Sequence, residues 1–434
     1  MRQVNKDVLD DFHRRGLVAQ LTADDELREH LASASRTVYC GFDPTADSLH
    51  IGSLVPLLAL RRFQDAGHRP ILLMGGATGL IGDPSFKAQE RALNTRDVVA
   101  GWVDKIQAQV RRFVRFDDSA TSALVVNNLD WIGEMSVMTF LRDVGKHFSV
   151  NTMIQREAVR QRIEREGSGI SFTEFSYLIL QSLDFAELNA RHGCTVQLGG
   201  SDQWGNITGG IDYTRRVRRA QVYGMTMPLV TKADGTKFGK TESGTIWLDG
   251  ARTSPYAFYQ FWLGTSDADV YKFLRYFTFL APETIAGIEA EDAVAAGRPQ
   301  AQQVLASHVT ELVHGEEGLA AAQRISEALF SGDIRTLDEA DLRQLRQDGL
   351  PSSTLDAGEL ARPLTQILSD GGLAASGKQV KDALARDAVH INGQPVGADS
   401  NLDAGACFAV ERALFGRYFL ARLGKKKWHL FERV

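Results

Sequence analysis

Short apolar runs alternate with stretches of helical periodicity through the first half of the chain, and this alternation limits the fold more than any other feature. A stretch of helical periodicity at residues 50–66 ends at Gly67. The runs expected to form strands are residues 36–42, 71–74, 123–127 and 195–199. Strands that alternate with helices favour a doubly wound parallel sheet of the α/β class. Ligands of such sheets bind at the carboxyl ends of the strands, so we expect a site in the loops that follow these runs.

The periodicity and the charge both change along the rest of the chain. From about residue 250 to 330 the apolar residues follow helical spacing. Residues 331–361 hold seven acidic and three basic residues, which predicts a linker. Residues 362–434 hold 11 Lys or Arg and 7 Asp or Glu, although the net charge of all 434 residues is −5. A basic terminal module on an acidic body indicates a polyanionic partner.

The three cysteines, Cys40, Cys194 and Cys407, are too far apart in the sequence for a disulfide framework or a CxxC metal site. This usage is typical of a reducing compartment. No run reaches the roughly 18 apolar residues of a membrane span, and the first residues lack the apolar core of a signal peptide. We therefore expect a cytoplasmic protein with no membrane segment.

The segment at residues 39–53 has the composition of a ligand-binding turn. A strand is expected to end there and a helix to begin near His50, so Thr45 and His50 would lie beside the exposed amides of a helix N-terminus, which bind anions. Gly52 would let a ligand approach the backbone closely. A purely structural turn, with Ser48 or His50 as the helix cap, explains the same residues.

A second segment, residues 231–241, is rich in small polar residues and carries Lys237 and Lys240 on either side of a glycine. Two ammonium groups on such a loop can meet a polyphosphate, which is what phosphoryl and nucleotidyl transfer require. The spacing of a Walker loop is absent. The alternative is a solvated hairpin turn.

A third segment begins with Ser171 and Glu174 at the spacing of a capping box and continues as an apolar helix. Tyr177, Gln181 and Asp184 follow at i, i+4 and i+7, so they share one narrow stripe of that helix. Three polar groups on an otherwise apolar helix indicate a polar pocket. The alternative is a core helix in which the tyrosine and the aspartate satisfy each other.

The first two segments together resemble the two signatures of class I aminoacyl-tRNA synthetases. The first stands here as His-Ile-Gly-Ser at residues 50–53, with Ser53 in place of the second histidine, and the other as Lys-Phe-Gly-Lys-Thr at residues 237–241. The third segment, with Tyr39, resembles the tyrosyl-tRNA synthetases of bacteria specifically, over essentially residues 10–434. Further motifs that carry this resemblance are residues 75–84, 140–151 and 199–206.

The resemblance implies a binding site for L-tyrosine. Tyr39 and Asp184 would hold the phenol hydroxyl. Asp83, Tyr177 and Gln181 would accept hydrogen bonds from the substrate ammonium. The side-chain amide of Gln203 would orient the substrate carboxylate. A site built to hydrogen-bond a hydroxyl rejects the analogue that lacks it, and tyrosyl-tRNA synthetases are themselves the usual example of this penalty.

The resemblance also implies that ATP is a substrate. Cys40 and Asp202 would lie near the ribose of ATP, and Ser53 stands where the family has a histidine. The other residues expected to contact ATP are Gly41, Asp43 and Gly52. Thr45 and His50 would hold the terminal phosphate, and the mobile loop would close over the pyrophosphate with Lys237, Lys240 and Thr241. Mg²⁺ is expected to arrive on the phosphates, because no dedicated metal site is evident in the sequence.

An RNA partner is implied by the C-terminal region. Residues 372–393 resemble a small RNA-binding module, with Lys378, Lys381 and Arg386 on a helix that precedes a strand and a turn. A basic, aromatic tail follows at residues 422–428. The alternative is a solvated charged helix followed by a C-terminus that binds other molecules nonspecifically. The arginine-rich run at 215–219 has the same two interpretations, and we expect a solvated helix face there.

These observations predict a Rossmann-type catalytic domain at residues 1–225, a lysine loop and helical anticodon-side domain at 226–330, a linker at 331–361 and a small α+β RNA-binding domain at 362–434. The family is dimeric, so the implied partners are L-tyrosine, ATP, tRNA(Tyr) and a second copy of the chain. An insertion around residues 127–160 would form the dimer interface. Residues 127–133 and 135–141 supply apolar surface for it, although both could be core.

Two alternatives to a tyrosine-specific synthetase differ in what they need from these residues. A tryptophan-specific relative is disfavoured because an indole has no hydroxyl for Tyr39 and Asp184. A catalytically silent RNA-binding paralogue usually lacks the lysine loop or the first histidine, and both are intact here.

Overall fold

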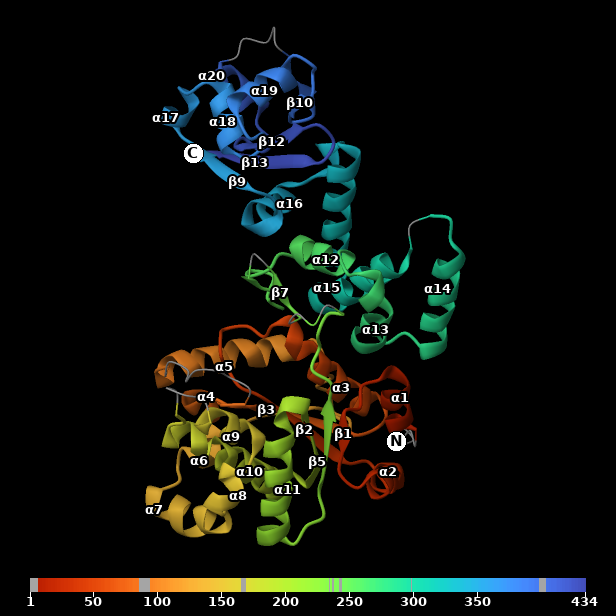
Figure 1. Cartoon of the computed structure of the whole chain (residues 1–434), viewed down its shortest axis with the longest axis vertical. Coiled ribbons are helices and arrows are strands. Elements are labelled where there is room, and N and C mark those ends of the chain that lie inside the picture. Colours follow the sequence, from red (N-terminus) through yellow and green to blue (C-terminus); the bar gives the residue numbers. More distant parts are fainter. Residues whose placement is uncertain are drawn as a thin grey trace. The chain divides into compact units, whose positions relative to one another are not determined.

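A six-stranded sheet forms the centre of the first of two structural units in this computed structural model (Figure 1). The structure describes residues 7–85, 94–164, 169–233, 235, 238–241, 244–297, 299–397 and 403–434. The first unit comprises Met1–Leu248 and Ser266–Ala301, and the second Asp249–Thr265 and Gln302–Val434.

The strand order of the first unit is β1-β6-β5-β2-β3-β4, in which β1 alone is antiparallel to its neighbour. The strands are β1 (Gln20–Leu21), β2 (Thr37–Phe42), β3 (Arg69–Met74), β4 (Leu124–Asn127), β5 (Cys194–Gly200) and β6 (Tyr223–Met227). The chain runs from β2 outward through β3 and β4, and then returns to β5 and β6 on the other side of β2. The expected doubly wound parallel sheet is confirmed, and its order reverses between β2 and β5, where ligands of such sheets bind.

Helices cover this sheet on both faces. Those of the first unit are α1 (Val8–Arg15), α2 (Asp24–Ser33), α3 (Leu54–Asp65), α4 (Thr78–Ile81), α5 (Arg96–Val110), α6 (Leu129–Ile132), α7 (Val137–Thr139), α8 (Val150–Ile154), α9 (Glu157–Ile163), α10 (Phe172–His192), α11 (Trp204–Arg218), α13 (Asp267–Phe277) and α14 (Pro282–Val294). The core between the sheet and α10 contains Tyr39, Ile71 and Leu183. A short hairpin of β7 (Lys240–Thr241) and β8 (Gly244–Thr245) follows β6.

The predicted helix at residues 50–66 begins later than expected. A single 3₁₀ turn, Ile51–Ser53, precedes α3, because the ring of His50 accepts a hydrogen bond from the amide of Gly52 and caps that turn. The helix ends near Gly67, whose φ of 95° suits glycine, as the sequence predicts.

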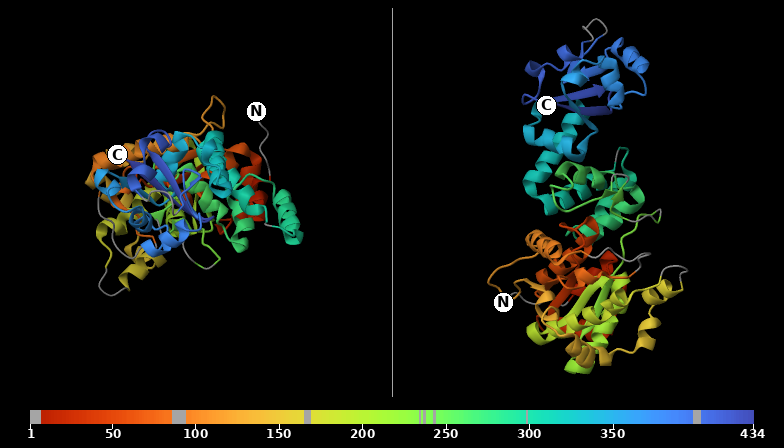
Figure 2. Two further views of the ribbon diagram at one scale, coloured as in Figure 1. Left: turned by 90° about the horizontal axis from the view of Figure 1, so that it is seen from above. Right: turned by 90° about the vertical axis from the view of Figure 1, so that its left-hand side faces the viewer.

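The second unit joins helices to a five-stranded sheet of order β11-β10-β12-β13-β9 (Figure 2). Its helices are α12 (Pro255–Leu263), α15 (Ala301–Ser331, interrupted at Gly315), α16 (Glu339–Gln344), α17 (Ala357–Leu360), α18 (Leu364–Asp370), α19 (Gly377–Leu384) and α20 (Ala404–Cys407). Its strands are β9 (Ser352–Leu355), β10 (Val389–Ile391), β11 (Gln394–Pro395), β12 (Tyr418–Leu423) and β13 (Lys427–Arg433).

The two faces of this second sheet bury different cores because side chains alternate along a strand. Phe419 and Phe431 pack with α18 and α19, whereas Tyr418, Leu420 and Leu430 pack with α15 and α16. The C-terminal sheet therefore shares a core with the end of the helical part.

The segment 331–361, which we expected to be a linker, is instead part of this second unit. It contains α16, and its strand β9 pairs in parallel with β13. Its acidic residues also have structural roles: Asp338 and Asp341 form a capping box on α16, and Arg324 of α15 donates to Asp341 at 2.7 Å. Acidic composition alone does not distinguish such capping residues from those of a linker.

Candidate active site

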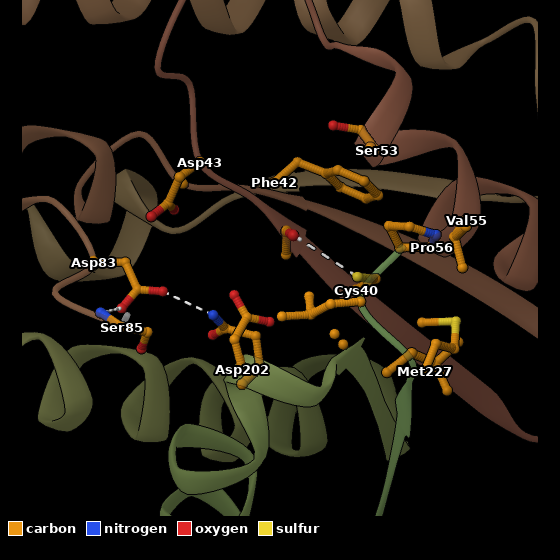
Figure 3. A pocket seen from close by; sticks show the side chains of 18 of the residues that line it. Cys40, Phe42, Asp43, Ser53, Val55, Pro56, Asp83, Ser85, Asp202 and Met227 are labelled. Atoms are coloured by element: carbon orange, nitrogen blue, oxygen red, sulfur yellow. Dashed lines mark hydrogen bonds between the residues drawn. The ribbon is translucent and has the colours of Figure 1, made fainter. Parts of the chain in front are cut away.

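A cavity of about 540 Å³ opens at the carboxyl ends of β2, β3 and β5, where the strand order reverses (Figure 3). The structure brings together on its walls every described side chain that the sequence predicted for the site, although these residues span 39–203. They are Tyr39, Cys40, Gly41, Asp43, Thr45, His50, Gly52, Ser53, Asp83, Tyr177, Gln181, Asp184, Asp202 and Gln203. Lys237 lies outside the described residues, as do the side chains of Lys240 and Thr241.

One end of the cavity holds buried polar groups around Asp184. The hydroxyl of Tyr39 is buried and has no hydrogen-bond partner among the residues that the structure describes, and the same is true of Oε1 of Gln181. Burial raises the pKa of the Asp184 carboxyl to about 7 and raises the pKa of Tyr39 well above its usual value. Unsatisfied polar groups in a buried position are costly, so they indicate a polar ligand.

Asp184 is held by two residues that the sequence did not assign to the site. Nε1 of Trp131 donates to its Oδ1 at 2.9 Å, and Nδ2 of Asn128 donates to its Oδ2 at 3.1 Å. Tyr177 does not pair with Asp184; its hydroxyl donates to Oδ2 of Asp43 at 2.7 Å. The alternative in which Tyr177 and Asp184 satisfy each other on a core helix is therefore wrong.

Trp131 and Asn128 agree with one of the two alternatives for residues 127–133, which could be apolar dimer surface or core. Trp131 is 6% exposed and Asn128 is fully buried, as core residues are. The signal that could have found them is the pairing of an amide with an indole directly after the predicted strand at 123–127, on the sheet edge where the site was expected.

The helix of the third segment begins with the predicted Ser171 cap, but the side chain of Glu174 binds a residue outside that helix. Oγ of Ser171 accepts from the amide of Glu174 and caps α10. The Glu174 carboxylate lies against the guanidinium of Arg162, with a donor–acceptor distance of 2.8 Å and both side chains buried. This ion pair secures the first turns of the helix that carries Tyr177, Gln181 and Asp184.

A second group of polar residues lies near Asp83. Nε2 of Gln203 donates to Oδ2 of Asp83 at 2.8 Å, and the amide of Ser85 donates to Oδ1 at 2.9 Å. Burial, with the charge of Asp83, raises the pKa of Asp202. Figure 3 shows Asp43, Asp83 and Asp202 around the same side of the cavity.

The segment around His50 is joined to the chain that follows the lysine loop. The amide of Ile51 donates to the carbonyl of Ile246, and the amide of Leu248 donates to the carbonyl of Leu49. Gly239, with a φ of 79°, packs against Ile51, and a Cβ at Gly239 would lie 2.3 Å from that side chain. Backbone contacts therefore hold the two signature segments side by side.

The hydrogen bond at His50 determines its tautomer. Nδ1 accepts from the amide of Gly52 at 3.0 Å, so in the neutral ring the proton is on Nε2, which can donate. A Cβ at Gly52 would lie 2.8 Å from the His50 ring, which explains the glycine. The cap that the sequence offered as an alternative is thus present.

Cys40 lies on the cavity wall as a neutral thiol, because burial raises its pKa to about 12. Among the described residues no group of three or more His, Cys, Asp and Glu side chains is arranged to hold a metal ion. None of the helices in the described part of the chain has the length and hydropathy needed to cross a membrane.

Two family models match the chain. One, described as tRNA synthetases class I (W and Y), matches residues 32–331, and the other, described as tyrosine–tRNA ligase SYY-like C-terminal domain, matches residues 341–431. Together with the parallel sheet, the cavity and the joined signature segments, these matches define a class I aminoacyl-tRNA synthetase.

Individual relatives narrow this class further. The tyrosine–tRNA ligase of Aliivibrio salmonicida is 62% identical over 98% of both chains, and that of Escherichia coli O139:H28 is 56% identical over 98% of this chain and 99% of the relative. A C-terminally truncated mitochondrial tyrosyl-tRNA synthetase of Aspergillus nidulans has a TM-score of 0.68 at 29% identity, covering 74% of this chain and 94% of that one. The chain belongs to the tyrosine–tRNA ligase family, which confirms the resemblance.

Proposed function

We propose that the cavity activates L-tyrosine with ATP, giving tyrosyl-adenylate and pyrophosphate, and that the enzyme then transfers the tyrosyl group to the 3′-terminal adenosine of tRNA(Tyr). Ligation of tyrosine to tRNA is the reaction of the family to which the chain belongs. The observation that carries this proposal within the site is the buried hydroxyl of Tyr39 beside Asp184, which has no partner in the described part of the chain. Such a pair needs a hydroxyl on its ligand, which tyrosine has and phenylalanine lacks.

The remaining polar side chains suit the other two groups of the amino acid. Asp83, Tyr177 and Oε1 of Gln181 are acceptors for the ammonium, and Gln203 orients the carboxylate. A charged amine in a closing site needs such acceptors, because burying it unpaired is costly.

ATP occupies the part of the cavity lined by Cys40, Gly41, Asp43, Gly52, Ser53 and Asp202. An oxygen of the tyrosine carboxylate attacks the α-phosphorus, and the bond from that phosphorus to the pyrophosphate oxygen breaks. The carboxylate is already ionised, so no general base is needed. Catalysis then depends on positioning and on stabilising the charge of the pyrophosphate.

The groups that stabilise this charge come from both signature segments. Thr45 and Nε2 of His50 donate to the terminal phosphate, and Lys237, Lys240 and Thr241 close over the pyrophosphate. The backbone contacts between residues 49–51 and 246–248 support this, since they join the segment of His50 to the chain that follows the lysine loop. Mg²⁺ would be held mainly by the ATP phosphates, where it would neutralise part of their charge.

The C-terminal part of the second unit is the proposed tRNA-binding module. Lys378, Lys381 and Arg386 are exposed on or just after α19, and the exposed lysines 425–427 lie at the turn between β12 and β13. Exposed cations that neutralise phosphates supply affinity without reading sequence. The exposed arginine-rich run at 215–219 is different, since Arg215 and Arg216 both pair with Asp212.

The chain is proposed to act as a homodimer in the cytoplasm. Described residues of the insertion expose several large apolar side chains, namely Val137, Met138, Leu141, Val150 and Ile154. Val137 and Met138 are each 72% exposed, and several large apolar side chains exposed along one short segment support an interaction surface there. The three cysteines are free thiols, as a reducing compartment requires.

Tyrosine-dependent exchange of pyrophosphate into ATP tests the activation step, with phenylalanine and tryptophan as competing substrates. Exchange with tyrosine alone is the expected result, whereas exchange with tryptophan would support the other specificity of the matched family model. Lys240→Ala should slow exchange and leave tyrosine binding in equilibrium dialysis nearly intact. Equal losses in both assays would mean that the lysine loop is structural.

A further inference from the structure

We propose that Thr78 and Asp43 are positioning residues of the amino-acid site: they hold the Tyr177 hydroxyl with its proton turned away from the substrate, so that its oxygen can only accept from the substrate ammonium. This inference rests on the proposed role of Tyr177. Sequence reasoning assigned Asp43 to ATP and did not include Thr78.

A continuous chain of hydrogen bonds runs from Asp184 to Tyr177 along the wall of the cavity. From Asp184 it runs to Nδ2 of Asn128 at 3.1 Å, and from that nitrogen to Oγ1 of Thr78 at 3.0 Å. Oγ1 of Thr78 is 2.7 Å from Oδ1 of Asp43, and Oδ2 of Asp43 is 2.7 Å from the hydroxyl of Tyr177. Thr78 is 2% exposed and Asn128 is fully buried, so bulk water does not compete with the bond between them.

The direction of each bond follows from one backbone amide. The amide of Ala77 donates to Asn128 at 2.8 Å, so the atom that it reaches must be the side-chain oxygen Oδ1. The other side-chain atom of Asn128 is then the nitrogen, which has two protons and no capacity to accept. It donates one proton to Asp184 and the other to Thr78.

The bond from Asn128 also fixes the direction of the hydrogen bond between Thr78 and Asp43. Its hydroxyl oxygen accepts from Asn128, so its single proton is available for Oδ1 of Asp43. An ionised carboxylate only accepts, and the proton of the Tyr177 hydroxyl therefore points to Oδ2 of Asp43. The lone pairs of the Tyr177 oxygen are what remain for a ligand, and they suit an ammonium.

The backbone around this chain keeps Asp43 in position. A Cβ at Gly75 would lie 2.0 Å from Oδ1 of Asp43 and 2.5 Å from Oγ1 of Thr78. The glycine therefore lets the loop after β3 close onto both side chains. Thr78 is the link that joins that loop to Asp43, because its hydroxyl is both acceptor and donor.

The test compares two inhibitors that differ only in the ammonium, tyramine and 4-ethylphenol, in the tyrosine-dependent exchange assay. Thr78→Val keeps the shape of the side chain and removes its hydroxyl. We expect it to weaken inhibition by tyramine about tenfold, as a lost hydrogen bond to a charged group does, and to change inhibition by 4-ethylphenol less than twofold. Thr78→Ser keeps the hydroxyl and should retain the preference of the unmodified protein for tyramine.

Several outcomes would overturn the inference. Equal weakening of both inhibitors by Thr78→Val would mean that Thr78 is merely structural, and no change for either would mean that the chain does not orient Tyr177. A loss of the tyramine preference in Thr78→Ser would assign the effect to the methyl group. If Thr78→Val does not fold, Thr78→Ala removes the same hydroxyl and is judged by the same ratio. Equal binding of the two inhibitors to the unmodified protein would instead refute the proposed ammonium site itself.

Discussion

The indole of Trp131 donates a hydrogen bond to the carboxylate of Asp184 across 2.9 Å, so a residue of α6 holds the aspartate that α10 directs into the cavity. Asn128 holds the other carboxylate oxygen. Each oxygen thus has one protein donor and a lone pair left for a ligand. The tyrosine hydroxyl meets a carboxylate whose rotation is already restricted, which reduces the entropy lost on binding.

Trp131→Phe should lower kcat/KM for tyrosine activation about tenfold. The substitution removes one donor to a buried carboxylate, and a hydrogen bond to a charged group contributes roughly 1.5–3 kcal/mol. Pyrophosphate exchange over a range of tyrosine concentrations measures the effect. Trp428→Phe, in the C-terminal sheet, is the matched control and should leave exchange unchanged. An equal loss in both variants would show that the effect is not local to Asp184.

Asp184→Asn should weaken the discrimination between tyrosine and phenylalanine. The amide keeps the size of the side chain but replaces an acceptor with a donor, so the pair that demands a hydroxyl is damaged. The measurement is the ratio of kcat/KM for the two amino acids in the exchange assay. An unchanged ratio would remove Asp184 from the tyrosine site.

Asp184 should also make the free energy of unfolding depend on pH. Its pKa is about 7 in the folded protein, whereas an exposed aspartate titrates near 3.8. Between these values the folded state holds a proton that the unfolded state has lost, so this group's contribution is fully present below about pH 4 and is lost as the pH rises to about 7. The slope from one such group is at most about 1.4 kcal/mol per pH unit. Urea unfolding from pH 4 to 8 should show a steeper fall for the unmodified protein than for Asp184→Asn, and parallel curves would contradict the raised pKa.

The buried ion pair of Arg162 and Glu174 should contribute strongly to stability. Arg162→Met leaves the Glu174 carboxylate buried without its partner, which should lower the free energy of unfolding by about 3–5 kcal/mol. The control is Arg160→Met, since the side chains of Arg160 and its partner Glu157 are each 54% exposed. That variant should unfold like the parent in urea. Similar losses in both variants would mean that the helix itself, and not the buried pair, is responsible.

Replacing Lys378 and Lys381 with alanine should impair tRNA charging and spare tyrosine activation. Both lysines are exposed in the C-terminal part, whereas the residues assigned to activation lie between 39 and 241. Each lost phosphate contact should reduce the slope of log affinity against log salt by roughly 0.7 to 0.9. Aminoacylation, exchange and tRNA affinity over a salt series test this. Normal charging with an unchanged slope would refute RNA binding at α19.

The order of strands and helices in the first unit and most residues of the cavity could be predicted from the sequence. Apolar periodicity is local, so β2, β3, β4 and β5 appear close to their predicted positions. The motif residues are also local, because each segment carries its own glycines, caps and polar side chains. Ser171 caps α10 as predicted, for example.

Partners across the fold could not be predicted, because they depend on which segments the tertiary structure brings together. Glu174, for example, pairs with Arg162, which lies on a different helix, α9. The composition of residues 331–361 predicts a linker, whereas in the structure β9 of this segment pairs with β13 at the edge of the C-terminal sheet.

The sequence by itself thus determined the doubly wound sheet, the positions of the signature segments and the residue types that face a ligand. Only the tertiary structure decided how those residues are oriented. The chain from Asp184 through Asn128, Thr78 and Asp43 to Tyr177 joins four separate segments. The direction of a hydrogen bond depends on the other bonds of the same group, and those partners are distant in the sequence and adjacent only in the folded chain.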